Sequence, residues 1–323
     1  MALQNHDLTA GTATAGDVLG AYLRSQATAF LRGLRPHEAG GDAADGGNEA
    51  ARGLRGAARR LGGTLATFRP VTESAWADGL RTELVWLSST LADEHAHGAR
   101  LTRLLDALHR LSGAPDVPAP RGAAGSGALT VGAARAAALL ERQLTLARTR
   151  AHSATLQALG SSRFHALADA VALLASEVPL SPVAARGRAE EVLVPLAALA
   201  ESRLAAAVTA LPLTRAARPY NADALIDDTR QDAPWHEVRR LLRAHRYARE
   251  ALGEDVTRLA AACGALDRHR DAAEAAAASS AAARTPRIAP ATAYALGVLH
   301  ADQRHEVEAA RFTFHHLWLP APV

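Results

Sequence analysis

Apolar residues recur along most of the chain at spacings of three and four, which is the period of an amphipathic α-helix. The first such segment has Val18, Leu19, Leu23 and Phe30 among its apolar residues. No segment alternates apolar and polar residues between turn signals, as a strand would. The pattern predicts helices over residues 17–35, 49–67, 72–111, 129–159, 162–177, 187–210, 234–252, 255–278 and 291–316.

Capping and breaking residues mark the ends of these helices. Asp17 is expected to cap the first helix, because an aspartate side chain accepts from free backbone N–H groups there. The segment Ala39–Asn48 holds four glycines and is expected to be a loop. The helical pattern over 72–111 is expected to bend near Ala92-Asp93.

The organisation of the chain follows from where the periodicity stops. Residues 1–15 form a polar tail, rich in Thr and Ala, that is predicted to be disordered. Residues 16–316 are predicted to form an all-α domain. Its first half covers about 16–112, a Pro- and Gly-rich linker covers 113–128, and its second half covers about 129–316.

Composition favours the same fold class. Alanine, leucine, arginine and glutamate dominate the chain, whereas aromatic residues make up 4%. The former are strong helix formers and the latter favour strands. We therefore expect helix bundles as the architecture.

One basic pattern occurs twice. The two copies are Arg52-x-x-Arg55-x-x-x-Arg59 and His236-x-x-Arg239-x-x-x-Arg243. The second copy follows the first by 184 residues at all three positions, which suggests an internal duplication.

In each copy the basic residues form one stripe of the helix, and the leucines face away from it. Like charges on one face repel by roughly a few tenths of a kcal/mol per pair, and Glu237 and Glu250 are expected to offset little of this. A merely solvated face usually mixes its signs, so the repeated pattern favours an anion-binding surface. The candidate residues are Arg52, Arg55, Arg59, Arg60, His236, Arg239, Arg240, Arg243, Arg246 and Tyr247.

The kind of basic residue points to the kind of anion. The net charge is +3, and the chain contains no lysine, so all 36 residues counted as Lys+Arg are arginine. A guanidinium group is planar, permanently charged and able to make two parallel hydrogen bonds to phosphate oxygens. Arginines ranked along two helices would suit inorganic polyphosphate, with binding that weakens as salt rises.

The two basic segments resemble the signature motifs of the CHAD family (conserved histidine α-helical domain). Residues 49–61 read Glu-Ala-Ala-Arg-Gly-Leu-Arg-Gly-Ala-Ala-Arg-Arg-Leu, similar to the family's His-x-x-Arg-Val-Ala-x-Arg-Arg-Leu-Arg-Ser. Residues 236–247 read His-Glu-Val-Arg-Arg-Leu-Leu-Arg-Ala-His-Arg-Tyr, similar to its His-x-x-Arg-Lys-x-x-Lys-x-x-Arg-Tyr. Residues 15–23 also look like the family's first helix, so the resemblance covers roughly residues 15–316.

The resemblance implies two helical bundles related by a pseudo-two-fold axis, around a central basic groove that binds inorganic polyphosphate. It also implies localisation to polyphosphate granules, with polyphosphate-metabolising enzymes as possible partners. The first motif departs from the family, because Arg52 replaces its histidine, Gly62 and Gly63 replace its last arginine and serine, and His95-Ala96 replaces a usual Arg-Asp pair. Each glycine weakens a helix by about 1 kcal/mol relative to alanine.

A catalytic function is the first alternative. CHAD domains often accompany a CYTH-type triphosphatase domain, whose Glu-x-Glu-x-Lys motif cannot exist in a chain without lysine. We therefore expect a stand-alone, non-catalytic protein with no catalytic residues and no cofactor. A phosphate-metabolising enzyme, or an accessory subunit of one, remains the alternative.

Metal binding and nucleic-acid binding are weaker alternatives. His95 and His97 point away from each other on a helix, His315-His316 is a weak signal, and His269 is expected at the surface or behind a site. No metal site is therefore expected. Single-strand binders need aromatic stacking platforms on a basic surface, and only Tyr247 lies on one, with Trp235 at its border. Non-specific nucleic-acid binding ranks below polyphosphate.

Cellular location is inferred from what the sequence lacks. Cys263 is the only cysteine, so no disulfide can form within the chain. The N-terminus does not resemble a signal peptide, and no stretch approaches 18 uninterrupted apolar residues. The sequence predicts a cytoplasmic protein without membrane association.

Overall fold

The computed structural model describes residues 13–38, 44–113, 124–218 and 229–319. In these ranges every element is a helix, apart from two isolated β-bridges, Thr14–Arg188 and Thr72–Leu180. The elements are α1 (Ala15–Glu38), α2 (Ala44–Thr67), the 3-10 helix η1 (Arg69–Val71), α3 (Ser74–Ser112), α4 (Ala124–Leu159), α5 (Ser162–Ser176), α6 (Pro182–Arg186), α7 (Ala189–Thr209), α8 (Leu213–Ala216), α9 (Thr229–Ala251), α10 (Thr257–Ala283) and α11 (Pro290–Trp318). The predicted all-α fold class is confirmed.

The chain divides into two compact units. Unit 1 comprises Met1–Ala92, Ala154–Val208 and Arg240–Leu259, and unit 2 comprises Asp93–Ser153, Thr209–Arg239 and Ala260–Val323. The long helices α3, α4 and α9 therefore contribute to both units. Each unit draws on both halves of the sequence, and the predicted internal duplication stays a prediction.

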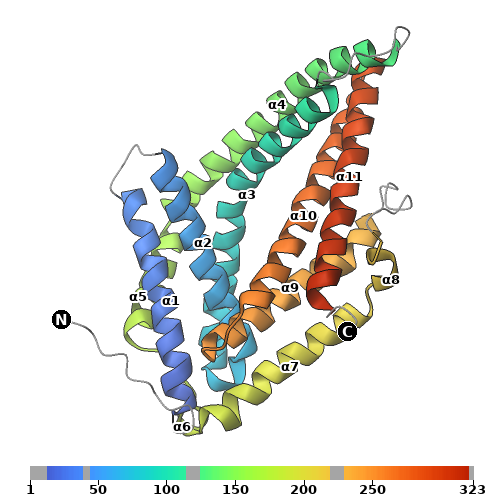
Figure 1. Cartoon of the computed structure of the whole chain (residues 1–323). Coiled ribbons are helices and arrows are strands. Elements are labelled where there is room, and N and C mark those ends of the chain that lie inside the picture. The colour runs from blue at the N-terminus through green and yellow to red at the C-terminus, as the bar shows by residue number, and fades with distance from the viewer. Residues whose placement is uncertain (1–12, 39–43, 114–123, 219–228, 320–323) are drawn as a thin grey trace, which may run out of the picture. The chain divides into compact units, whose positions relative to one another are not determined.

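The core of unit 1 fixes which face of α2 is left for its arginines. Helices α1 and α2 pack side by side (Figure 1). Gly33 makes this close approach possible, because a Cβ atom there would lie 3.1 Å from the Cβ atom of Leu54. Leu54 and Leu61 of α2, and Phe68 directly after it, are buried in this core. Each such side chain contributes about 1.5–3 kcal/mol on burial, so the arginine face cannot turn inward.

One buried core cluster of unit 2 is built from alanine and leucine side chains in equal numbers. Leu104 of α3, Leu140 of α4, Ala275 of α10 and Leu299 of α11 belong to this cluster. Alanine has no flexible side chain to order, so alanine-rich helices pack closely at low entropic cost.

The start of α1 differs from the prediction. The hydroxyl of Thr14 accepts from the backbone N–H of Asp17 (3.1 Å), and the carboxylate of Asp17 accepts from the backbone N–H of Thr14 (3.3 Å). This is a capping box, in which Thr14 is the N-cap and Asp17 occupies the third helical position. The prediction that Asp17 is the cap was wrong by three residues, because the reciprocal partner at that position was not considered.

Two other helix boundaries differ from the prediction. Helix α2 begins at Ala44, inside the segment expected to be a loop, because glycines lower helix propensity without excluding a helix. Helix α3 is a single helix from Ser74 to Ser112, and the division between the two units falls between Ala92 and Asp93, where a bend was expected. Most of the predicted tail (1–12) and of the predicted linker (114–123) lies outside the described residues; α4 begins at Ala124.

Helix α7 is long and apolar enough to cross a membrane, which the sequence analysis did not anticipate. Its best 18-residue window has a mean hydropathy of 1.5, with 22% of the window buried. It is a candidate membrane span by length and composition alone, and a single such helix is weak evidence for a membrane protein. A stripe that includes Leu193 and Ala197 packs into the core of unit 1.

Candidate functional site

Helix α2 presents its four candidate arginines on one side of unit 1. Arg52 is exposed, whereas Arg55, Arg59 and Arg60 are partly buried. The Nη1 atom of Arg55 donates to the backbone carbonyl oxygen of Leu91 at 3.4 Å. The arginine stripe predicted for this helix therefore exists, and only its first member is exposed.

The C-terminal part of α9 carries the other candidate residues of unit 1. Arg240 is exposed, Arg243 and Arg246 are partly buried, and Tyr247 is buried. Val238, Leu242 and Ala248 of this helix are buried.

Glu250 brings the two basic helices together within unit 1. One of its carboxylate oxygens accepts from Nε of Arg60 on α2 at 2.8 Å, and the other accepts from Nε of Arg246 on α9 at 2.8 Å. The hydroxyl of Tyr22 on α1 donates to the same carboxylate at 3.1 Å. The expectation that Glu250 offsets little of the repulsion was therefore wrong, since this carboxylate pairs with an arginine of each basic helix.

The charge of Glu250 shifts the pKa values of its partners. Burial alone would lower the pKa of Arg60, but the hydrogen bond and the charge of Glu250 outweigh it and raise that pKa. Burial, and after it the charge of Glu250, raises the pKa of Tyr22 far above its usual value, so the phenol stays a hydrogen-bond donor. The arrangement is a fixed cluster of two cations, one anion and one neutral donor.

Tyr247 lies against the same two arginines. The guanidinium carbons of Arg60 and Arg246 lie 5.7 Å and 5.9 Å from the centre of its ring, within range of cation–π attraction. A Cβ atom at Gly63 would lie 2.7 Å from Cδ2 of Tyr247, closer than atoms tolerate. Gly63 was expected only to weaken α2, but the structure shows that its missing side chain makes room for the tyrosine. We call Arg60, Arg246, Tyr247 and Glu250 the arginine cluster.

The remaining candidates, His236 and Arg239, belong to unit 2. Nε of Arg239 donates to Oδ1 of Asp267 on α10 at 2.5 Å. The ring of His236 lies edge-on to the ring of His269, with 5.4 Å between ring centres. Burial lowers the pKa of His236, and the nearby Arg239 adds to this effect while Asp232 opposes it. The imidazole is therefore mainly neutral near pH 7 in the free protein.

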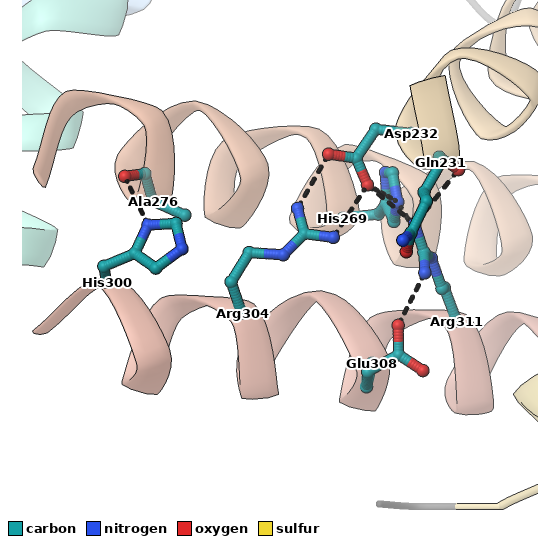
Figure 2. A network of polar contacts seen from close by, with 8 residues as sticks. All are labelled: Gln231, Asp232, His269, Ala276, His300, Arg304, Glu308 and Arg311. Carbon is teal, nitrogen blue, oxygen red and sulfur yellow. Dashed lines mark hydrogen bonds and ion pairs between the residues drawn. The ribbon is translucent and has the colours of Figure 1, made fainter. Parts of the chain in front are cut away.

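A buried ionic network lies next to these residues (Figure 2). Asp232 of α9 accepts from Nη1 of Arg304 (2.7 Å) and from Nη2 of Arg311 (2.6 Å), both on α11. Nη1 of Arg311 also donates to Glu308 (2.6 Å), and its Nε lies 3.2 Å from Nε2 of His269. Burial, and then the charge of Arg311, holds the pKa of His269 well below its usual range. We call Asp232, Arg304, Glu308, Arg311 and His269 the buried network.

The sequence interpretation missed this network. His269 was expected at the surface or behind a site; it is fully buried, so the first alternative was wrong, and it lies against the candidate His236. The available signal was the spacing of Arg304, Glu308 and Arg311, which places three charges on one face of α11 beside its apolar stripe. The network also explains why α9 begins at Thr229, before the predicted start at 234, since Asp232 is anchored to α11.

The described residues include no cluster of metal ligands, and the cavity found in unit 2 is not lined by any candidate residue. In the described ranges no group of three or more His, Cys, Asp or Glu side chains could hold a metal ion. A cavity of about 490 Å³ lies in unit 2, between α3 and α11. Arg103, Asp106, Arg110, Gln303 and Glu306 are among the residues that line it, and none of them is a candidate from the sequence.

Known proteins resemble this chain in sequence and in structure. The family model described as CHAD domain matches residues 25–279. Among solved structures, the chain is similar to "PptA from Streptomyces chartreusis", with 58% identity over 95% of this chain and 99% of that one, and a TM-score of 0.80. It also matches the CHAD domain from the plant Ricinus communis, with 22% identity over 98% of this chain and 96% of that one, and a TM-score of 0.49. No curated protein matches the chain significantly.

Proposed function

Since the chain belongs to the CHAD domain family, we propose that it binds inorganic polyphosphate, without catalysis, through the arginines of α2 and α9. The family match is consistent with the polyphosphate-related function that the resemblance implies. The candidate binding residues in unit 1 are Arg52, Arg55, Arg59, Arg60, Arg240, Arg243 and Arg246.

The arginine cluster is the observation that carries this proposal. Arg60 and Arg246 stand far apart in the sequence, yet both donate to one carboxylate and lie beside one tyrosine ring. A carboxylate that holds two guanidinium groups leaves a net positive charge, which a phosphoryl chain would neutralise. Charge-assisted hydrogen bonds from arginine to phosphate are among the stronger polar contacts in proteins.

Arg59 adds independent support from the same helix. Its Nε atom is buried and has no hydrogen-bond partner among the described residues. A buried donor on a charged group costs more than about 1–3 kcal/mol if it stays unsatisfied. An anionic oxygen on this side of α2 would satisfy it.

The aromatic residues favour polyphosphate over single-stranded nucleic acid. Tyr247 is 6% exposed and Trp235 is 1% exposed, so neither offers a free face on which a base could stack. Base stacking supplies about 1–3 kcal/mol per base in proteins that bind single strands. Binding through guanidinium groups alone would depend on phosphate charge rather than on bases.

The absence of lysine supports the non-catalytic part of this proposal. Without lysine the chain cannot hold the Glu-x-Glu-x-Lys motif of CYTH-type triphosphatases. We further propose that the protein acts in the cytoplasm at polyphosphate granules, beside the enzymes that make or degrade the polymer. An accessory role for such an enzyme would need no active site in this chain.

A titration tests the proposal. Long-chain polyphosphate should bind saturably in a filter-binding assay, and the affinity should fall steeply as salt rises, because bound counterions are released. An RNA of equal phosphate content should compete poorly, and purified protein with divalent metal should release no phosphate from tripolyphosphate. Equal competition by RNA would favour general polyanion binding, and enzymatic phosphate release would overturn the non-catalytic role.

A further inference from the structure

Glu250 stands out because its carboxylate is held by three helices of unit 1. It accepts from Tyr22 on α1, Arg60 on α2 and Arg246 on α9. Its side chain is only 14% exposed. Both oxygens are used, since Arg246 donates to Oε1, and Arg60 and Tyr22 donate to Oε2.

The position of Glu250 on its own helix does not account for it. It is the penultimate residue of α9, where the partial negative charge of the helix C-terminus disfavours a carboxylate. Its pairing with Arg246 also has the less favourable order, since glutamate stabilises a helix better when it precedes the basic residue by four. The contacts with α1 and α2 must therefore compensate for an unfavourable local position.

The way the two arginines are held leaves most of their donors for an anion. Each guanidinium group has five N–H donors, and each uses its Nε–H for Glu250. Among the described residues the two terminal nitrogens of each group, with four N–H bonds, donate to no other acceptor and are left for a ligand. The two groups are tied to each other through Glu250, because each donates to one oxygen of its carboxylate.

Displacement of Glu250 by a ligand would be costly. If a ligand took over Arg60 and Arg246, the carboxylate of Glu250 would remain mostly buried and would keep only Tyr22 of its three present donors. A buried charge that loses its partners is strongly destabilising. A phosphoryl group is therefore expected to add to the cluster while Glu250 keeps its place.

We propose that Glu250 is a positioning residue that holds Arg60 and Arg246 in place for neighbouring phosphoryl units. This inference rests on the proposed polyphosphate binding and names the group that orders its site. Guanidinium groups held together favour a chain of linked phosphoryl units over single orthophosphate ions, because a chain can contact this pair and the neighbouring arginines of α2 and α9 at once. Glu250 thus contributes selectivity although its charge repels the ligand.

The sign of one substitution separates positioning from simple charge. Glu250→Gln removes a negative charge next to a polyanion, so charge alone predicts tighter binding. Positioning predicts the opposite, because an amide cannot accept from both arginines through both of its terminal atoms. We expect about tenfold weaker binding of long-chain polyphosphate, and a salt dependence flatter by about 0.7 for each phosphate that an arginine no longer neutralises.

Glu254→Gln is the matched control. Glu254 also lies in unit 1 and pairs with an arginine, Arg249, that is not a candidate binding residue. Its substitution removes the same charge and should leave the affinity equal or slightly higher. Equal or tighter binding by Glu250→Gln than by wild-type protein would overturn the positioning role.

If Glu250→Gln does not fold, a second variant tests the positioning role of Glu250. Tyr22→Phe keeps every charge and removes one hydrogen bond to Glu250, and we expect about threefold weaker binding. Unchanged affinity in Tyr22→Phe would then overturn the inference. Failure of the wild-type protein to bind polyphosphate would overturn the proposed function itself, and this result is distinct from a normal wild-type affinity with unaffected variants.

Discussion

The arginine cluster and the buried network both combine arginines with carboxylates, but they differ in net charge and in exposure to solvent. In the buried network two arginines face two carboxylates, and the arginines are 2% and 7% exposed. In the arginine cluster two arginines share one carboxylate, and they are 31% and 21% exposed. The first arrangement is charge-balanced and buried, as a structural ion network requires. The second keeps a positive excess within reach of solvent, as an anion site requires.

The comparison shows that arginine in helical ranks is not by itself a sign of binding. Arg304 and Arg311 lie seven residues apart on one helix, as Arg52 and Arg59 do. Only the partners differ, because Asp232 and Glu308 neutralise the pair on α11. What distinguishes a ligand site is therefore the count of carboxylates that tertiary packing brings to the arginines.

The largest expected effect is on stability, at the buried network. Asp232→Ala leaves Arg304 and Arg311 buried with only part of their charge compensated, and should lower the free energy of unfolding by about 3–5 kcal/mol. Asp78→Ala is the control, since Asp78 forms an exposed ion pair with Arg69 and its loss should destabilise the protein far less. Urea denaturation measures both. Equal losses in the two variants would show that the network is not structural.

Gly63→Ala should produce the next largest loss. A methyl group at Gly63 would collide with the Tyr247 ring and should cost about 1–3 kcal/mol. Gly53→Ala, on the same helix, meets no atom within 4 Å and should stabilise the protein by up to about 1 kcal/mol. Thermal denaturation compares them. If both variants gained stability, the close approach of Tyr247 to α2 would be wrong.

A smaller effect should appear in the pH dependence of stability. The pKa of His269 lies below the value of about 6.5 for an unfolded histidine, so the unfolded chain binds this proton more readily. Stability from this group is therefore present above about pH 6.5 and is lost as the pH falls below it. His236, whose pKa burial also lowers, acts in the same direction.

Removal of the His269 imidazole should flatten this dependence. In His269→Gln the slope of unfolding free energy below pH 6.5 should fall by at most about 1.4 kcal/mol per pH unit, the contribution of one proton. Urea denaturation between about pH 7.5 and pH 5.5 measures the slope. An unchanged slope would mean that His269 is not held neutral by the buried network.

Local sequence patterns predicted the helices and the basic faces well. The period of the leucines in α2 fixes its buried side, and the arginine stripe follows on the opposite side. The start of α1 was less predictable, because Thr14 and Asp17 cap it together rather than singly. The pattern of one helix predicts a structural feature when the interactions that produce the feature lie within that helix.

Contacts between distant segments were not predictable from the same patterns. Gly63 and Glu250 were interpreted only on their own helices, as a weak helix former and as a minor neutralising charge. The structure places Gly63 under Tyr247 and Glu250 between Arg60 and Arg246. Such pairings depend on how α2 packs against α9, and periodicity does not determine which helices become neighbours.

The measurement that tests the central claim most directly compares two double variants of equal charge. Arg60→Ala with Arg246→Ala removes both guanidinium groups of the arginine cluster, and Arg186→Ala with Arg188→Ala removes two exposed arginines elsewhere in unit 1. Circular dichroism should first show that both variants keep their helices. Filter binding of long-chain polyphosphate across a salt series should then show about a hundredfold loss, and a clearly flatter salt dependence, for the cluster variant only. Equal losses in both variants, or no loss in the cluster variant, would contradict the account.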